Sequence, residues 1–268
     1  MNSPIMKVVI LCGGFGTRLR EETEIKPKPM VEIGGKPILW HIMKTFAHHG
    51  YHEFVLCLGY KGDTIKNYFL NYAQLNNDFT VELGTGDIQV HHNHEETDWK
   101  VTLVNTGPNA MTGARIKRIE NYIDGDEFLL TYGDGVTDLN INELVDFHRS
   151  RNKIGTVTGV APPSHYGELD VSGDDVISFQ EKPDSKDSFI SGGYFVFNRT
   201  IFNYLTADDN CVLERAPLEK LSKDGQLSVY GYNGFWQCMD TYRDYMFLNE
   251  LWDQGGAKWK VWDSFKTK

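Results

Sequence analysis

The chain carries the apolar run Val8-Val-Ile-Leu-Cys12 near its start, and the segment Gly13-Gly-Phe-Gly-Thr-Arg18 follows at once. The first run is rich in β-branched residues, which predicts a buried strand. Glycines after such a strand let the backbone approach a ligand closely and present N–H groups to anionic oxygens. Arg18 and, a few residues later, Lys28 add positive charge at the same place. The combination predicts a site for a polyphosphate.

Two common phosphate-binding loops do not match this segment. A P-loop needs a Lys-Ser or Lys-Thr pair after its glycines, and the sequence has neither here. The dinucleotide fingerprint of nicotinamide-dependent oxidoreductases would begin at Gly14, but Leu19 stands at its last glycine position. A bare glycine cluster could also be only a tight turn. The run Lys26-Pro-Lys-Pro-Met30 favours a binding site, because its prolines predict a stiff, extended segment that directs its lysines.

Composition points to a globular α/β chain with a substantial core. Its 268 residues suit one sizeable domain, and 40% of them are hydrophobic. The formal net charge of −10 argues against a nucleic-acid partner, since such proteins usually carry a basic stripe. No apolar run approaches the roughly 20 residues that span a bilayer, and residues 1–5 are too short and polar for a signal peptide. We therefore expect a cytoplasmic protein that binds neither nucleic acid nor membrane.

Two groups of possible metal ligands are weak candidates. The four cysteines are scattered and contain no Cys-x-x-Cys pair, so we expect reduced, buried thiols and no structural zinc. The segment His91-His-Asn-His-Glu-Glu96 has a spacing that matches no closed zinc site. It lies inside the polar stretch 79–104, where we expect an extended hairpin that is exposed or packed on another subunit.

Strand and helix alternate in the first half of the chain, which predicts a mainly parallel sheet with helices on both faces. Periodicity predicts strands over 8–11, 54–58 and 128–131, and helices over 38–47, 62–72 and 141–149. The second half is more mixed. There we expect strands over 156–160, 169–171, 176–179 and 194–197, a hairpin turn at 172–175 and a helix over 242–252.

Two aspartates stand where open α/β sheets bind ligands. Asp134 follows the strand 128–131 between two glycines, and Asp240 follows the strand-like run 235–239. Two carboxylates that face a triphosphate suit Mg²⁺, which prefers one or two carboxylates together with phosphate oxygens and water. Either aspartate alone could equally cap a turn.

Several motifs together resemble the signature of the sugar-phosphate nucleotidyltransferases. They are Leu11–Leu19, Lys26–Met30, Gly34–Pro37, Met111–Arg115, Tyr132–Gly135 and Trp236–Asp240. The similarity begins at Met6 and runs through nearly the whole chain. It implies an α/β fold with a Rossmann-like, mixed but mainly parallel sheet flanked by helices. It also implies one domain over 6–268, with a nucleotide-binding part over 6–150 and a small β-rich, sugar-binding part over 151–268.

The resemblance implies an enzyme that transfers a nucleotidyl group, with CTP and glucose 1-phosphate as the substrates of the most similar members. The sugar phosphate would attack the α-phosphorus of CTP in line, and CDP-glucose and pyrophosphate would form. Lys28 would hold the α-phosphate, Arg18 the β- and γ-phosphates, and Lys182 the acceptor phosphate. Asp134 and Asp240 would bind Mg²⁺ as cofactor.

The resemblance also implies a wider set of substrate contacts. Glu181 would accept sugar hydroxyls. Base recognition would fall to Asn109 and to Thr112–Ala114, whose backbone can read the pyrimidine edge, although the family usually has glycine where Ala114 stands. The full set of implied substrate-binding residues, besides Lys182, is Leu11, Gly13, Gly14, Gly16, Thr17, Lys26, Asn109, Thr112, Gly113, Ala114, Gly133, Tyr166, Gly167, Glu181, Gly192 and Gly193.

Alternatives stay open at this point. A relative specific for dTTP or UTP would carry the same motifs. A non-catalytic regulatory subunit with this fold should have lost a lysine or aspartate, whereas Lys28, Asp134, Lys182 and Asp240 are all present. The resemblance further implies a homo-oligomer, for which 79–104 is the candidate contact, and a product used in dideoxysugar synthesis for bacterial O-antigens and lipopolysaccharide.

Overall fold

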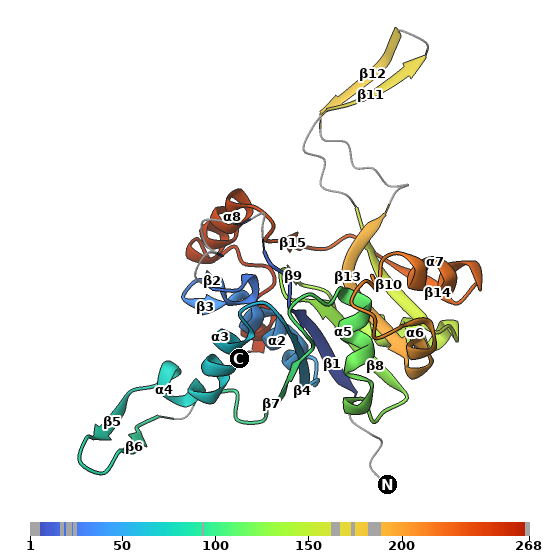
Figure 1. The fold of residues 1–268 in the computed structure, drawn as a ribbon. Helices are drawn as coiled ribbons and strands as arrows, with labels where there is room; N and C mark the ends of the chain where they lie inside the picture. Colours follow the sequence, from blue (N-terminus) through green and yellow to red (C-terminus); the bar gives the residue numbers. More distant parts are fainter. Residues whose placement is uncertain are drawn as a thin grey trace.

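The structure is a computed structural model that describes residues 6–16, 19, 23, 26–92, 94–161, 167–172, 175–181 and 189–265. A seven-stranded sheet forms its centre, with the strand order β14-β10-β13-β8-β1-β4-β7 (Figure 1). Its strands are β1 (Lys7–Cys12), β4 (Glu53–Leu58), β7 (Lys100–Asn105), β8 (Glu127–Tyr132), β10 (Gly155–Val160), β13 (Ile190–Asn198) and β14 (Leu227–Tyr232).

The sheet is mixed but mainly parallel, as predicted. β1 pairs in parallel with β4 and β8, and β4 pairs in parallel with β7. β13 runs antiparallel to both β8 and β10, and β10 is parallel to β14. The β8–β13 pairing joins the two halves of the chain in one sheet.

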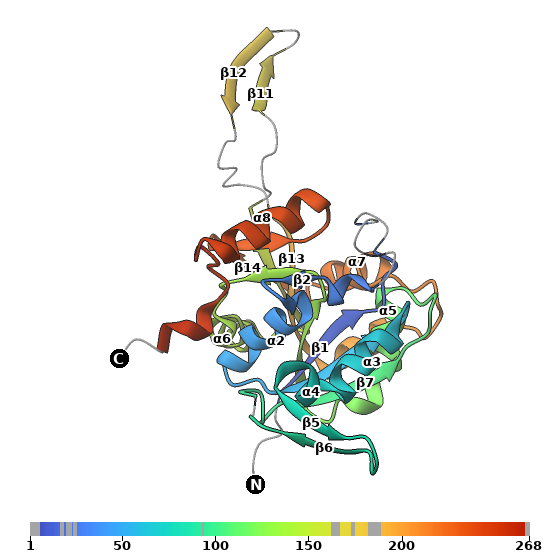
Figure 2. The same cartoon turned by 90° about the vertical axis from the view of Figure 1, so that its left-hand side faces the viewer.

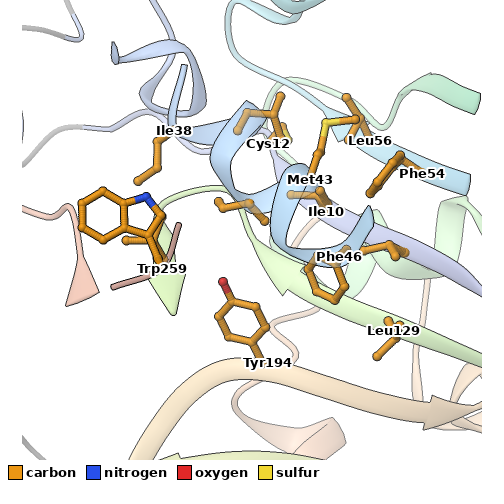
Figure 3. Close-up of a cluster of buried hydrophobic side chains, with 14 of the residues drawn as sticks. Ile10, Cys12, Ile38, Met43, Phe46, Phe54, Leu56, Leu129, Tyr194 and Trp259 are labelled. Carbon is orange, nitrogen blue, oxygen red and sulfur yellow. The ribbon is translucent and has the colours of Figure 1, made fainter. Parts of the chain in front are cut away.

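Helices cover both faces of this sheet, which explains why its strands are apolar on both sides. Alternate residues of β1 contribute to two different cores: Val8, Ile10 and Cys12 to one, Val9 and Leu11 to the other. Figure 3 shows part of the first core, in which side chains from α2 pack on the sheet. The helices are α2 (Ile38–His48), α3 (Gly62–Leu70), α4 (Tyr72–Asn76), α5 (Thr112–Arg118), α6 (Ile141–Arg151), α7 (Ala216–Lys223) and α8 (Tyr242–Asp253).

Three predictions for the first half need correction. The predicted helix 62–72 is interrupted at Asn71, whose side-chain amide donates to the carbonyl of Asn67 (2.8 Å) and competes with helical bonding. The predicted extended segment 26–30 is extended only at Pro27, and Lys28–Met30 form a 3-10 turn. The φ of a proline also suits the start of a helical turn.

The third correction concerns the stretch 79–104. Only its first part is a hairpin, formed by β5 (Phe79–Glu82) and β6 (Asp87–Val90), which projects from the molecule in Figure 1 and faces the viewer in Figure 2. Its last part is β7, an edge strand of the central sheet. Val101 and Leu103 pack against the core, and this burial explains why 100–105 joins the sheet.

Small two-stranded sheets complete the fold. They pair β2 (Glu32–Ile33) with β3 (Lys36–Pro37), β9 (Gly135–Thr137) with β15 (Trp236–Cys238), and β11 (Gly167–Ser172) with β12 (Asp175–Glu181). The β11–β12 pairing confirms the predicted hairpin. All four cysteines are free, but Cys211 and Cys238 are only partly buried, contrary to the prediction. In the described part of the chain, no helix is both long and apolar enough to cross a membrane.

Candidate active site

A cavity of about 460 Å³ opens where β1 and β8 end. This position is the one expected for a ligand in an open α/β sheet. Among the described residues, those that line the cavity are Leu11, Cys12, Gly13, Gly14, Phe15, Gly16, Lys28, Pro29, Asn109, Ala110, Met111, Thr112, Arg115, Tyr132, Gly133, Asp134 and Asp240.

Lys28 and the two aspartates meet on one wall of this cavity. The ammonium Nζ of Lys28 lies 2.7 Å from Asp134 Oδ2 and 2.6 Å from Asp240 Oδ1. Burial alone would lower the pKa of Lys28, but Asp134 and Asp240 outweigh it and hold that pKa well above its ordinary value. Asp134 is 106 positions and Asp240 is 212 positions from Lys28 in the chain. Only the fold therefore brings the three residues together.

Backbone contacts bring the segments that carry Lys28 and Asp134 close together. Gly133 donates its N–H to the carbonyl of Leu11 (3.1 Å), and a Cβ there would lie 2.9 Å from the ring of Pro29. A glycine at 133 therefore lets the Lys28–Met30 turn pack close to the end of β8.

Asp240 reaches the site through a small sheet and not through the central one. β15 pairs with β9, which follows Asp134 directly, and the N–H of Met239 donates to the carbonyl of Asp134 (2.8 Å). The N–H of Asp240 donates to Asp244 at the capped start of α8 (3.1 Å). Asp240 therefore follows a strand as predicted, but a strand outside the central sheet.

The two carboxylates fit a divalent metal ion. Single ligand atoms of Asp134, Cys238 and Asp240 lie within 4.8 Å of one another. Carboxylate oxygens suit a hard cation such as Mg²⁺, whereas a thiol does not. Burial, followed by Asp134, raises the pKa of Cys238 and keeps its thiol protonated. The chemistry of the donors therefore favours the two aspartates alone.

The side chain of Arg115 forms hydrogen bonds to backbone carbonyls next to the cavity. Its guanidinium is buried and donates to the carbonyls of Gly13 (3.0 Å), Leu58 (3.1 Å) and Gly107 (2.8 Å). Burial is the largest cause of a lowered pKa for Arg115. The sequence analysis used Arg115 only as part of a motif, because no local pattern reveals a side chain that spans several loops.

The residues implied for base recognition are only partly brought together. Asn109 and Thr112 line the cavity, but Gly113 and Ala114 do not. The N–H of Ala114 donates to the carbonyl of Cys211 (3.1 Å), and a Cβ at Gly113 would lie 2.6 Å from the sulfur of the same cysteine. The N–H of Ala114 is therefore already bonded within the protein, and a role of Ala114 in base recognition stays a prediction.

Several other predicted residues lie away from this cavity. Lys26 pairs with the exposed carboxylate of Glu32 (2.9 Å) instead of turning inward. Gly192 and Gly193 lie in β13, where the indole of Trp236 donates to the carbonyl of Gly192 (2.7 Å). Gly167 and Glu181 are paired at the end of the β11–β12 hairpin. Thr17, Arg18, Tyr166 and Lys182 lie outside the described residues.

The structure adds the cavity residues Phe15, Met111 and Tyr132, which the sequence analysis did not name as site residues. The predicted residue Thr112 donates to Glu214 Oε2 (2.6 Å), and the hydroxyl of Tyr132 donates to the other oxygen of the same carboxylate. Phe15 and Met111 expose apolar side chains into the cavity. Both hold positions within or beside the quoted motifs, so the motif boundaries were the available signal.

Known proteins resemble this chain both in sequence and in structure. A model of the nucleotidyl transferase family matches residues 7–244. A glucose-1-phosphate cytidylyltransferase of Salmonella typhi is 50% identical over 96% of this chain and its own whole length. A probable glucose-1-phosphate cytidylyltransferase of Bacillus subtilis is 46% identical over the same shares. Among solved structures, HddC from Yersinia pseudotuberculosis superposes with a TM-score of 0.67 at 25% identity, over 92% of this chain and 99% of HddC.

The fold, the cavity at the ends of β1 and β8 and the Lys28–Asp134–Asp240 group agree with these similarities in sequence. Together they show that this chain is an enzyme that belongs to the nucleotidyltransferase family.

Proposed function

We propose that the protein is a glucose-1-phosphate cytidylyltransferase, which transfers CMP from CTP to α-D-glucose 1-phosphate and forms CDP-glucose and pyrophosphate. The observation that carries this proposal is the cavity in which a glycine-rich loop faces a lysine and two carboxylates. The substrates are supported by two curated relatives of that name, whose whole length the chain covers.

The reaction needs no nucleophile from the protein. A phosphate oxygen of glucose 1-phosphate forms a bond to the α-phosphorus of CTP, and the bond between that phosphorus and the bridging oxygen breaks. The electron pair leaves with pyrophosphate. Because both reactants are anions, the protein must hold them in line and neutralise charge as it moves to the leaving group.

Lys28 is the described cation best placed for this task. We infer that its ammonium turns from the aspartates to the α-phosphate when the nucleotide binds. Asp134 and Asp240 would hold Mg²⁺, which supplies positive charge to the phosphate oxygens when bound. Enzymes of this family generally use a divalent metal ion, and magnesium is our specific proposal. Arg18 and Lys182 keep their proposed roles on the leaving pyrophosphate and the acceptor phosphate.

The proposed organisation is one domain over 6–268, with a nucleotide-binding part over 6–150 and a sugar-binding part over 151–268. The β8–β13 pairing supports a single domain, because it joins the two parts in one sheet. We also propose that the enzyme is a homo-oligomer. Support comes from the β5–β6 hairpin, which exposes Phe79, Val81, Leu83 and Ile88.

The test is pyrophosphate release with glucose 1-phosphate and Mg²⁺, with CTP, UTP, dTTP and ATP compared in parallel. We expect the highest kcat/KM with CTP. A higher value with UTP or dTTP would keep the reaction and overturn the base. No release with any nucleotide, from folded protein, would overturn the proposed function and favour a non-catalytic subunit.

A further inference from the structure

Arg115 contacts an unusual set of partners for a buried guanidinium. Only 4% of the residue is exposed, yet within the described residues no carboxylate lies at ion-pair distance from it. Its Nη1 and Nη2 donate instead to neutral oxygens at the ends of three strands, β1, β4 and β7. These acceptors are the carbonyls of Gly13, Leu58, Gly107 and Pro108 and the hydroxyl of Thr106.

The surrounding sequence is adapted to this side chain. A Cβ on Gly13 would lie 2.2 Å from Arg115 Cζ, and one on Gly59 would lie 2.4 Å from Nη1. Either contact is far shorter than atoms tolerate. The two glycines therefore let the planar guanidinium lie against the backbone at the ends of β1 and β4.

The hydrogen bonds fix the direction of two peptide groups. In a planar trans peptide, the C=O and the following N–H point in opposite directions. Because Arg115 (3.0 Å) and the N–H of Tyr60 (3.3 Å) both hold the carbonyl of Gly13, the N–H of Gly14 points away from the guanidinium. The carbonyl of Pro108 (3.4 Å) fixes the N–H of Asn109 in the same way.

Both of these N–H groups belong to the cavity. Gly14 and Asn109 line it and are exposed, and a Cβ built on Gly14 meets open space. Within the described part of the chain, neither N–H donates a hydrogen bond to the protein. Free N–H groups of this kind bind phosphate oxygens well, because an anionic acceptor makes the hydrogen bond stronger.

We propose that Arg115 is a positioning residue, which turns the N–H groups of Gly14 and Asn109 toward the phosphates of the bound nucleoside triphosphate. This inference rests on the proposed function in one respect, since it takes the cavity to hold a nucleotide. Arg115 acts through the backbone, and its buried charge also favours an anion nearby. A lysine cannot replace it, because a single ammonium cannot bond to three strand ends in a fixed plane.

The test compares CTP with cytidine, which has the same base and ribose but no phosphate. CTP binding is measured by calorimetry without glucose 1-phosphate, and cytidine binding by ligand-observed NMR. For Arg115→Lys we expect CTP affinity to fall roughly tenfold to a hundredfold, since hydrogen bonds to charged groups are lost. Cytidine affinity should change less than about threefold, within the usual variation of neutral contacts.

Gly59→Ala is the second variant, because its Cβ would displace both the guanidinium and the Gly13 carbonyl (2.7 Å) that the guanidinium holds, and Gly59 does not line the cavity. It should weaken CTP binding in the same direction. Arg199→Lys is the matched control: Arg199 donates to the carbonyl of Glu120 (3.3 Å), and neither residue lines the cavity. It should bind CTP as the wild type does. Thermal unfolding checks that every variant is folded.

Two outcomes would overturn the inference. One is wild-type affinity for CTP in folded Arg115→Lys and Gly59→Ala. The other is an equal loss for CTP and cytidine, which would mean a general distortion of the cavity. Pyrophosphate release by the wild type is measured separately, so a failure of the proposed function is distinguished from a failure of this inference.

Discussion

At the residue scale, one lysine carries most of the chemistry that the described residues offer. Lys28 pairs with two carboxylates in the free protein and, in the proposed function, would pair with a phosphate in the complex. The amine is a compact, mobile charge on a flexible stem, which suits an exchange of partners. Its neighbour Lys26 pairs with exposed Glu32.

Replacing Lys28 by alanine should lower turnover by roughly 10²–10³, as for the loss of one preorganised electrostatic donor. Initial-rate measurement of pyrophosphate release checks this. Lys26→Ala is the matched control and should keep nearly wild-type turnover, because its side chain lies outside the cavity. Near-wild-type turnover of folded Lys28→Ala would remove the residue from the mechanism.

A second residue, His41, should make the stability of the fold depend on pH. His41 is fully buried among Trp40, Trp252 and Trp259, and burial lowers its pKa to about 4 from an ordinary 6.5. Its ring nitrogens bond to the carbonyl of Ile33 (2.8 Å) and the indole of Trp259 (3.4 Å). The neutral ring is therefore part of the core.

Stability should fall as the pH drops from 6.5 toward 4. In this window the unfolded chain binds a proton at His41 and the folded chain does not, so protonation favours unfolding. The loss is at most about 3 kcal/mol, from the difference of the two pKa values. Urea unfolding at several pH values measures it. His41→Gln should be less stable at neutral pH and show a shallower fall, and an unchanged slope would exclude His41 as the cause.

At the element scale, capped helices fix both the fold and the site. Asn140 accepts from the N–H groups of Asn142 and Glu143 and so begins α6 where the sequence predicted. Thr241 and Asp244 form a capping box at the start of α8. The second cap also holds the N–H of Asp240, so it links helix formation to the site.

Because only the α8 cap contacts Asp240, variants of the two caps form a matched pair. Asn140→Ala and Thr241→Ala should each lower the free energy of unfolding by about 1 kcal/mol, the usual cost of a lost N-cap. Only Thr241→Ala should also lower turnover, because the start of α8 positions Asp240. Urea unfolding and initial rates on both proteins provide the measurement. Equal turnover in the two variants would contradict a link between the α8 cap and Asp240.

Strand and helix prediction succeeded where burial is regular and failed where elements are short. The strands β1, β4 and β8 are continuous apolar runs, and α2, α6 and α8 have clear helical periodicity and end signals. The sequence analysis did not predict α5, which has seven residues and an internal glycine, or β14, which also contains glycine. α5 packs against β1 and β14 pairs with β10, and a local pattern records neither contact.

At the scale of the whole molecule, the β5–β6 hairpin is the least buried regular element of the first half. Nearly all its residues are exposed, although its sequence alternates apolar and polar side chains in the manner of a half-buried strand. An apolar surface of this kind usually marks a contact with another chain. The proposed homo-oligomer would cover it.

Light scattering after gel filtration should give a mass that is a multiple of the 30.6 kDa chain. Leu83→Lys, at a side chain that is 90% exposed, should shift this mass toward the monomer without loss of thermal stability of the monomer fold. Tyr122→Lys, an exposed aromatic in another region, is the control and should leave the mass unchanged. A monomeric wild type would end this proposal.

The sequence by itself determined the fold class, the main elements and the type of site. Apolar periodicity, turn residues and helix caps are local, so the strand β1, its glycine-rich loop and the capped helices could be predicted directly. The motif around Lys28 and the two aspartates also pointed to a phosphate and metal site. Each of these features is fixed by neighbours along the chain.

Only the tertiary structure decided which residues meet. Lys28, Asp134 and Asp240 are joined by the ends of β8, a small β9–β15 sheet and a 3-10 turn. Arg115 bonds to the ends of three strands, Lys26 pairs with Glu32, and the N–H of Ala114 is bonded to Cys211. Contacts between distant segments depend on packing and strand order, and no local pattern encodes these.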